Sequence, residues 1–141
     1  MFYIGFVSGA RVSEEGWPHA EGELTLGDYS ERFEASLTHW RMADYEAHWR
    51  RAVARLASGA ARSALIVSYG GADGITDMRP RWREGAQVIL HERLVLPSEG
   101  HTPVDPEHPE AEVGERVSVG EDGPISEWTV PFGAVLAFLA E

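Results

Sequence analysis

The densest group of side chains able to do chemistry lies in GHTPVDPEHPEAEVGE, residues 100–115. His101, Asp105, Glu107 and His108 fall within eight positions there. Imidazole and carboxylate groups bind zinc or manganese, but these histidines are seven residues apart in a proline-broken loop, which matches neither a helical H-x-x-x-H pair nor a zinc-finger spacing. The pattern favours an acidic surface loop. A small metal-dependent hydrolase that uses the His101 to His108 loop is the alternative.

No other part of the sequence assembles a nucleophile, a base and an orienting group. No serine lies in a G-x-S-x-G motif, and Gly70-Gly71 follows an apolar run without the lysine of a phosphate-binding loop. His91 and Glu92 are adjacent in a predicted strand, where neighbours point to opposite faces. We therefore predict no catalytic residue, no metal and no cofactor, and we expect that the protein is not an enzyme.

The charges of the chain are segregated along its 141 residues, with a formal net charge of -11. Residues 13–34 contain seven acids and one arginine, and residues 96–141 contain ten acids and one arginine. Residues 41–95, in contrast, contain nine arginines and six acids. A negative field repels phosphate backbones and anionic headgroups, so we expect no direct binding to nucleic acid or membrane. A basic protein partner would be attracted.

The composition of the chain also indicates its cellular compartment and its number of domains. The sequence has no cysteine, and no apolar run approaches the roughly 18 to 20 residues that span a bilayer. A secretory signal has a basic region before its apolar segment, and the N-terminal MFYIGFVSGARV does not. We therefore expect a cytoplasmic protein, and the length and 43% apolar content predict one domain over residues 1–141.

The first half of the chain has the spacing of strands followed by one helix. FYIGFVSG, residues 2–9, is typical of a buried strand, and alternating apolar positions before and after GDYS, residues 27–30, predict a hairpin. Apolar residues then recur at helical spacing from Tyr45 to Leu56. This spacing predicts an amphipathic helix at about 42–58, which Gly59 ends.

The second half is predicted to add strands and a final helix. SALIVSY, residues 63–69, predicts a central buried strand, and the runs around REGA, residues 83–86, predict a hairpin. Pro80 indicates an edge position or a bulge, because proline donates no ladder hydrogen bond. TVPFGAVLAFLAE predicts a C-terminal helix at about 130–140 with Thr129 as its N-cap.

The fold class that these elements predict is α+β. We expect a mainly antiparallel β-sheet, with the amphipathic helix at about 42–58 across one face and the C-terminal helix packed beside it. In ISEWTVP, Ile125 and Trp128 are predicted to anchor the last helix to the sheet, and Glu127 to accept a hydrogen bond from Arg50 or Arg51.

Three patches of sequence are similar to one family of immunity proteins from bacterial contact-dependent growth inhibition (CDI) systems. They are DYEAHWRRAVARLASG, SALIVSY and DGPISEWTVP with the apolar tail FLA. The order of elements resembles this family from Phe2 to Leu139, and ISEW is the most distinctive patch. The resemblance implies a cytosolic, non-enzymatic antitoxin that binds the toxic C-terminal domain of a delivered effector, commonly a nuclease, and covers its active site.

The acidity of the chain suggests how such inhibition would work. A nuclease active site must be cationic to hold phosphate, so displayed carboxylates can occupy it as a mimic of nucleic acid. The candidate toxin-binding residues are the acids of the proline-stiffened loop and of the following turn: Asp105, Glu107, Glu110, Glu112, Glu121 and Asp122. Prolines reduce the entropy that such a loop loses on binding. A second alternative is an acidic scaffold domain that binds a basic partner without inhibiting it.

Overall fold

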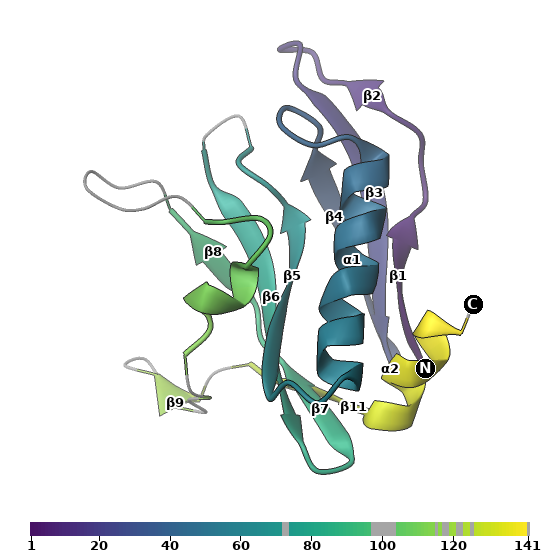
Figure 1. Ribbon diagram of the computed structural model, residues 1–141. Helices are drawn as coiled ribbons and strands as arrows, with labels where there is room; N and C mark the ends of the chain where they lie inside the picture. The colour runs from purple at the N-terminus through teal and green to yellow at the C-terminus, as the bar shows by residue number, and fades with distance from the viewer. Residues whose placement is uncertain are drawn as a thin grey trace.

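The computed structural model describes residues 1–71, 74–96, 104–114, 116, 119–120, 123–124 and 126–140. These residues form a four-stranded sheet, a five-stranded sheet, a two-stranded ladder and two α-helices (Figure 1). Every strand pair among them is antiparallel, which confirms the predicted α+β class. Among the described residues, no helix has the length and apolarity needed to cross a membrane.

The four-stranded sheet is formed by the N-terminal part of the chain. Its strands are β1 (Phe2–Phe6), β2 (Arg11–Val12), β3 (Pro18–Leu26) and β4 (Tyr29–Ser36). β3 pairs with β4 along one side and with β1 and β2 along the other. The predicted hairpin at GDYS is confirmed, since Leu26 pairs with Tyr29 and Gly27 takes a φ of 64° in the turn. Only glycine adopts this left-handed conformation without strain.

Burial alternates along β3, so its two faces differ. Ala20, Leu24 and Leu26 are buried, whereas the intervening polar residues are only half-buried. Gly22 belongs to the buried set, and a Cβ there would lie 2.3 Å from the ring of Phe33. The inner face of this sheet therefore packs on the core, and its outer face is polar.

The five-stranded sheet contains β5 (Arg62–Ser68), β6 (Thr76–Glu84), β7 (Gln87–Leu90), β8 (Arg93–Val95) and β11 (Trp128–Pro131). Its order is β11-β7-β6-β5, and β8 pairs with β6 beyond the end of β7. The predicted hairpin at REGA is confirmed, with Glu84 opposite Gln87 and a φ of 61° at Gly85.

Pro80 lies in the interior of this sheet, so the predicted edge position or bulge is wrong. β6 has neighbours on both sides, and Pro80 itself pairs with Ala64 of β5. On the other side its carbonyl accepts a hydrogen bond from the N–H of His91 at 2.9 Å. His91 stands where the neighbouring strand changes from β7 to β8, so the missing proline N–H falls at a break in the ladder.

The helix α1 (Met42–Ala57) confirms the helix predicted at about 42–58. Tyr45, Trp49 and Leu56 are buried, and Gly59 follows the helix with a φ of 107°. The ring of Trp49 packs against Phe33 of the four-stranded sheet, so α1 covers the inner face of that sheet. Figure 1 shows α1 lying along the junction between the two sheets.

α1 also protects an open strand edge, which corrects the prediction that residues 63–69 form a central strand. β5 ends the order of its sheet. His48 Nε2 accepts a hydrogen bond from the N–H of Ile66 at 2.8 Å, and Trp49 Nε1 donates to the carbonyl of Ile66 at 2.9 Å. The helix side chains thus satisfy the main-chain groups that a neighbouring strand would satisfy, which explains why an edge strand is so apolar.

The C-terminal helix α2 (Phe132–Leu139) is shorter than the 130–140 predicted. Thr129 is not its N-cap, because Thr129 lies in β11 opposite Ile89, and Pro131 occupies the N-cap position. α2 packs beside the N-terminus, with the rings of Phe2 and Phe138 5.5 Å apart (Figure 1). Trp128 is half-buried, packs against the core and stacks on Tyr29, so it connects β11 to the four-stranded sheet; Ile125, the other predicted anchor, lies outside the described residues.

Candidate functional site

The described part of the predicted acidic loop contains a short 3-10 helix, η1 (Pro109–Glu112). Asp105 and Glu107 are exposed, and Asp105 Oδ1 accepts the N–H of Glu107 at 3.0 Å. Val104, Pro109 and Val113 are buried and attach the segment to the body of the protein. Two of the candidate carboxylates are therefore displayed to solvent from a docked segment.

The other two described candidates are tied to neighbouring groups. Glu110 lies 3.6 Å from Nη1 of Arg55 and 3.4 Å from Nδ1 of His108, and its side chain is only 16% exposed. Glu112 is half-buried, and its carbonyl accepts a hydrogen bond from Arg93. Arg55 of α1 thus offsets part of the negative charge that the sequence places in this loop.

The remaining candidates and the metal alternative lie partly outside the described residues. Glu121 and Asp122, predicted to bind toxin, and His101 of the possible metal group are among the residues that the structure does not describe. Among the residues that it does describe, no group of three or more histidine, aspartate or glutamate side chains is arranged to hold a metal ion.

Side chains from three strands hold the segment that follows η1. Arg93 donates to the carbonyl of Glu112, Arg62 to that of Val113 at 3.1 Å, and Trp82 Nε1 to that of Gly114 at 2.9 Å. Three successive carbonyls are therefore bound by β8, β5 and β6. Two of the nine arginines in residues 41–95 therefore serve this segment, and a guanidinium suits the role because it has several donors in a rigid fork.

An ion-pair cluster secures the same region further along the chain. Arg116 donates to both carboxylate oxygens of Glu127 at 2.7 and 2.8 Å, and His91 Nε2 lies 2.7 Å from Glu127. The hydrogen bonds from Arg116 and then His91 lower the pKa of Glu127 to about 2. The partner predicted for Glu127, Arg50 or Arg51, is therefore wrong. Arg50 instead donates to the carbonyl of Leu139 at 2.9 Å.

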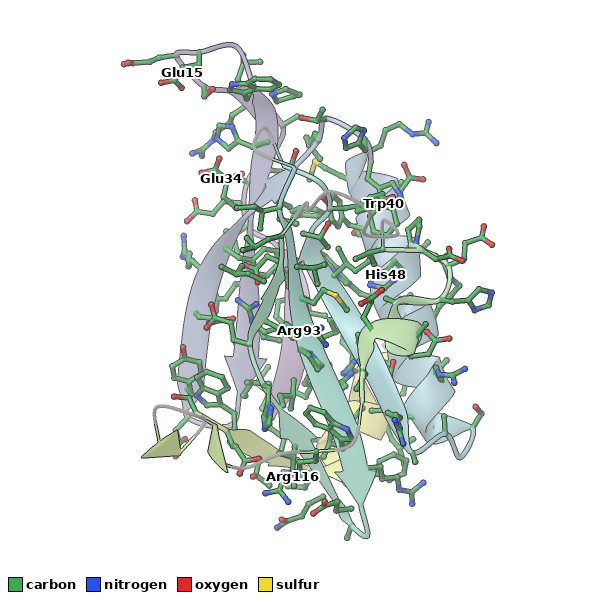
Figure 2. The ribbon with its side chains drawn as sticks, turned by 90° about the vertical axis from the view of Figure 1, so that its left-hand side faces the viewer. Glu15, Glu34, Trp40, His48, Arg93 and Arg116 are labelled. Atoms are coloured by element: carbon green, nitrogen blue, oxygen red, sulfur yellow. The ribbon has the colours of Figure 1, made fainter. Side chains whose placement is uncertain are left out.

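A second acidic surface, which the sequence did not single out by residue, covers the outer side of β3 and β4. We call it the β3–β4 face, and it consists of His19, Glu21, Glu23, Arg32 and Glu34. Residues of odd number on β3 and of even number on β4 share this side, because they are cross-strand partners in the antiparallel register. Figure 2 shows Glu34 pointing away from α1, on the same side of the molecule as Glu15.

The charges of the β3–β4 face are unequally paired. Glu21 stands directly opposite Glu34 in the ladder. Arg32 lies 3.5 Å from Glu21 and 3.6 Å from Glu23, whereas the closest basic group to Glu34 is His19 Nδ1 at 3.9 Å. Within the described part of the chain, no arginine is within ion-pair distance of Glu34, whose side chain is 70% exposed. Like charges directly opposite each other destabilise a sheet.

An open cleft of about 370 Å³ adjoins this face. Its walls include Glu15, Trp17, His19, Glu34 and Asp77. Trp17 lies at the β2–β3 turn, where its carbonyl accepts the N–H of Ser13 and its own N–H donates to Oγ of Ser13, both at 3.0 Å, and 45% of its surface is exposed. A second depression, of about 410 Å³, is also lined by His19 and Glu34, together with Arg11 and Arg32. The sequence contained a signal for this site, since residues 13–34 are strongly acidic and Trp17 lies among polar residues.

Two of the buried basic side chains, His48 and Arg81, lie in the core and belong to neither surface. Burial, followed by the charges of Arg51 and Arg81, lowers the pKa of His48 to about 3, consistent with a neutral imidazole that accepts the Ile66 N–H. Arg81 is fully buried over the ring of Phe2 at 5.3 Å, and none of its three guanidinium nitrogens has a hydrogen-bond partner among the residues that the structure describes. Burial lowers the pKa of Arg81 to about 9, so it remains charged at neutral pH.

Comparison with known proteins identifies the class to which this fold belongs. A family model described as the CdiI N-terminal domain matches residues 35–138. A chain of the solved "CdiA-CT/CdiI toxin and immunity complex from Enterobacter cloacae" has a TM-score of 0.86 and 26% sequence identity, over 99% of this chain and 97% of that chain. A search of the curated proteins gave no significant match.

These matches define a toxin inhibitor rather than an enzyme. The chain belongs to the CdiI family, the immunity proteins of contact-dependent growth inhibition systems. The resemblance inferred from the three sequence patches is confirmed.

Proposed function

We propose that this chain acts in the cytoplasm, where it binds and neutralises its cognate CdiA-CT toxin domain, and that this toxin is a basic nuclease. The chain covers the cationic active site with an acidic surface and so excludes the nucleic-acid substrate. Binding, rather than turnover, protects the cell. Asp105 and Glu107, with the other acids of the η1 region and with Glu121 and Asp122, contribute to this negative field.

The observation that carries the proposal is the display of exposed carboxylates on a chain of net charge -11, among them Asp105, Glu107 and Glu34, which have no arginine within ion-pair distance among the described residues. A protein that needed acidity only for solubility gains nothing from placing Glu21 opposite Glu34, where repulsion lowers stability. A cationic partner would turn this repulsion into attraction. Opposite fields also steer association, to about 10⁸ M⁻¹s⁻¹ or faster at low salt, which suits the capture of a toxin that arrives already active.

The experiment uses the toxin domain encoded beside this chain. We expect a 1:1 complex in calorimetric titration, with a dissociation constant that rises steeply between about 0.05 M and about 0.5 M salt, because screening weakens long-range attraction. Cleavage of RNA and DNA by the toxin is measured in the same mixtures. One equivalent of this chain is expected to abolish cleavage.

Each failure has its own meaning. A toxin that binds but keeps its nuclease activity would indicate an acidic scaffold rather than an inhibitor. Neutralisation of a toxin that cleaves no nucleic acid would contradict the nuclease assignment. Zinc or manganese titrated into the chain alone tests the metal-dependent hydrolase, for which heat on binding and its loss in a His101→Ala/His108→Ala variant would be required.

A further inference from the structure

We propose that the toxin docks on the β3–β4 face and in the adjoining cleft, with Trp17 as the anchor and Glu34 as the principal partner for a toxin arginine or lysine. This inference rests on the proposed function and deepens it, because it selects one of the two acidic surfaces as the contact site. The η1 region then attracts the toxin from a distance without touching its active site.

The two acidic surfaces point in different directions, so a single toxin active site contacts one of them. Figure 2 shows Glu34 on one side of the molecule and α1 with the green η1 helix on the other. A standard interface takes up about 800 Å² on each partner, which is a patch on one side of a protein of this size. The toxin active site is therefore expected to contact either the β3–β4 face or the η1 region, but not both.

Pairing favours the β3–β4 face. Glu110 of η1 already has Arg55 at 3.6 Å, and the main chain nearby is bound by Arg62 and Arg93. A toxin cation placed there would meet these arginines as well as the acids. On the β3–β4 face, Arg32 lies beside Glu21 and Glu23. Glu34, in contrast, has no arginine within ion-pair distance in the described residues. A cation beside Glu34 also relieves the repulsion from Glu21 across the strands.

The outer side of the four-stranded sheet is also open and rigid. α1 covers only the inner side, through contacts such as Trp49 with Phe33. The face is carried on two strands that pair continuously from His19 with Ser36 to Leu26 with Tyr29. Carboxylates held on a sheet lose less conformational freedom on binding than carboxylates on a loop.

The cleft supplies the apolar contact that charge alone lacks. Trp17 is 45% exposed on a wall that also carries Glu15 and Glu34. Tryptophan is the best aromatic partner for a cation, and it is enriched among the few residues that dominate binding energy. A guanidinium or ammonium group that enters the cleft can stack on the indole while it pairs with a carboxylate. The occupant that this geometry fits is an arginine or lysine at the rim of the toxin active site.

The test measures the affinity of the cognate toxin domain for four forms of the whole chain. Trp17→Ala is expected to weaken binding by about 30-fold or more, as loss of a central anchor does. Glu21→Gln/Glu34→Gln is expected to weaken it by about tenfold and to make its salt dependence shallower. The matched control is Glu46→Gln, because Glu46 is an exposed acid on α1, and its effect is expected to stay below about threefold.

The outcomes separate this inference from the proposed function. If wild type binds and inhibits the toxin while Trp17→Ala and Glu21→Gln/Glu34→Gln do so equally well, the docking site is elsewhere and the function stands. If wild type does not bind, the proposed function itself fails. Each variant is first checked by urea unfolding. If Trp17→Ala does not fold, Glu21→Gln/Glu34→Gln decides the outcome, because both of its changes relieve repulsion and leave the core intact.

Discussion

The imidazole of His48 makes a hydrogen bond that a neighbouring strand would otherwise make to β5. Its Nε2 accepts the main-chain N–H of Ile66 at 2.8 Å. The adjacent Trp49 donates to the carbonyl of the same residue. α1 therefore closes the open edge of β5 with side chains. Such an edge would otherwise be free to pair with another chain, and here it becomes part of the core.

This arrangement predicts a specific sensitivity to acid. Burial, with the charges of Arg51 and Arg81, lowers the pKa of His48 from its ordinary 6.5 to about 3. Between these values the unfolded chain takes up a proton that the folded chain does not, so stability present above pH 6.5 is lost as the pH falls towards 3. This group contributes a slope of up to about 1.4 kcal/mol per pH unit.

Urea unfolding of wild type and of His48→Gln between pH 7.5 and pH 4 tests the prediction. Glutamine retains a hydrogen-bonding side chain but does not titrate. The slope of unfolding free energy against pH is expected to be smaller in His48→Gln. Equal slopes in the two proteins would show that His48 does not carry the effect.

Arg81 and Arg79 form a matched pair two residues apart on β6. Arg79 is buried with two carboxylates, Glu31 at 2.8 Å and Asp77 at 2.5 Å, whereas the guanidinium of Arg81 has no hydrogen-bond partner in the described part of the chain. Replacing an uncompensated buried charge with an apolar side chain of similar length is expected to stabilise the fold by about 1 to 4 kcal/mol. Arg81→Met should therefore raise the free energy of unfolding.

The control for this prediction is Arg79→Met, which leaves Glu31 and Asp77 without their cation and is expected to cost about 3 kcal/mol. Thermal and urea unfolding measure both variants. A loss of stability in Arg81→Met as large as that in Arg79→Met would mean that the buried Arg81 contributes favourably, through its contact with Phe2 or otherwise.

Glu34 should show opposite effects on stability and on binding. Because Glu34 faces Glu21 and has no arginine partner among the described residues, Glu34→Gln is expected to raise the free energy of unfolding by about 0.2 to 1 kcal/mol. The same variant should bind the toxin more weakly. Unfolding at low and at high salt checks the cause, since screening should shrink the gain. A destabilised Glu34→Gln would show that the carboxylate serves the fold.

The acids of the η1 region are expected to affect the rate of association more than the lifetime of the complex. Asp105→Asn/Glu107→Gln removes two exposed charges from a surface that we place outside the contact. We expect association with the toxin to slow by about two- to threefold at low salt, with an unchanged dissociation rate. Stopped-flow mixing and surface-plasmon measurements separate the two rates. A dissociation rate raised tenfold would move the contact to η1.

Sequence patterns predicted the elements that are determined by residues close together in the chain. The spacing from Tyr45 to Leu56, with Gly59 after it, was sufficient for α1, and alternation was sufficient for the β3–β4 hairpin. Thr129 was misassigned as a helix N-cap because it pairs instead with Ile89 of β7, forty residues earlier in the chain, and the local sequence does not show this pairing. Pro80 was misassigned because the break in the neighbouring strand that accommodates it is a tertiary feature.

The candidate binding surfaces were likewise predicted only as far as neighbouring residues determine them. Net charge by segment indicated both acidic regions, but the sequence did not show which acids are already paired. The Arg55–Glu110 contact joins residues 55 positions apart, and the His91–Glu127 contact joins residues 36 positions apart. Only the register of β3 with β4 places Glu21 opposite Glu34.

The central claim is that this chain neutralises a nuclease by covering its cationic active site. The most direct measurement is a competition between the chain and a cleavage-resistant phosphorothioate oligonucleotide for the cognate toxin domain. We predict that the apparent dissociation constant of the toxin–chain complex rises in proportion to the oligonucleotide concentration, with no ternary complex. An apparent dissociation constant that does not change with oligonucleotide, or a stable ternary complex, would contradict the claim.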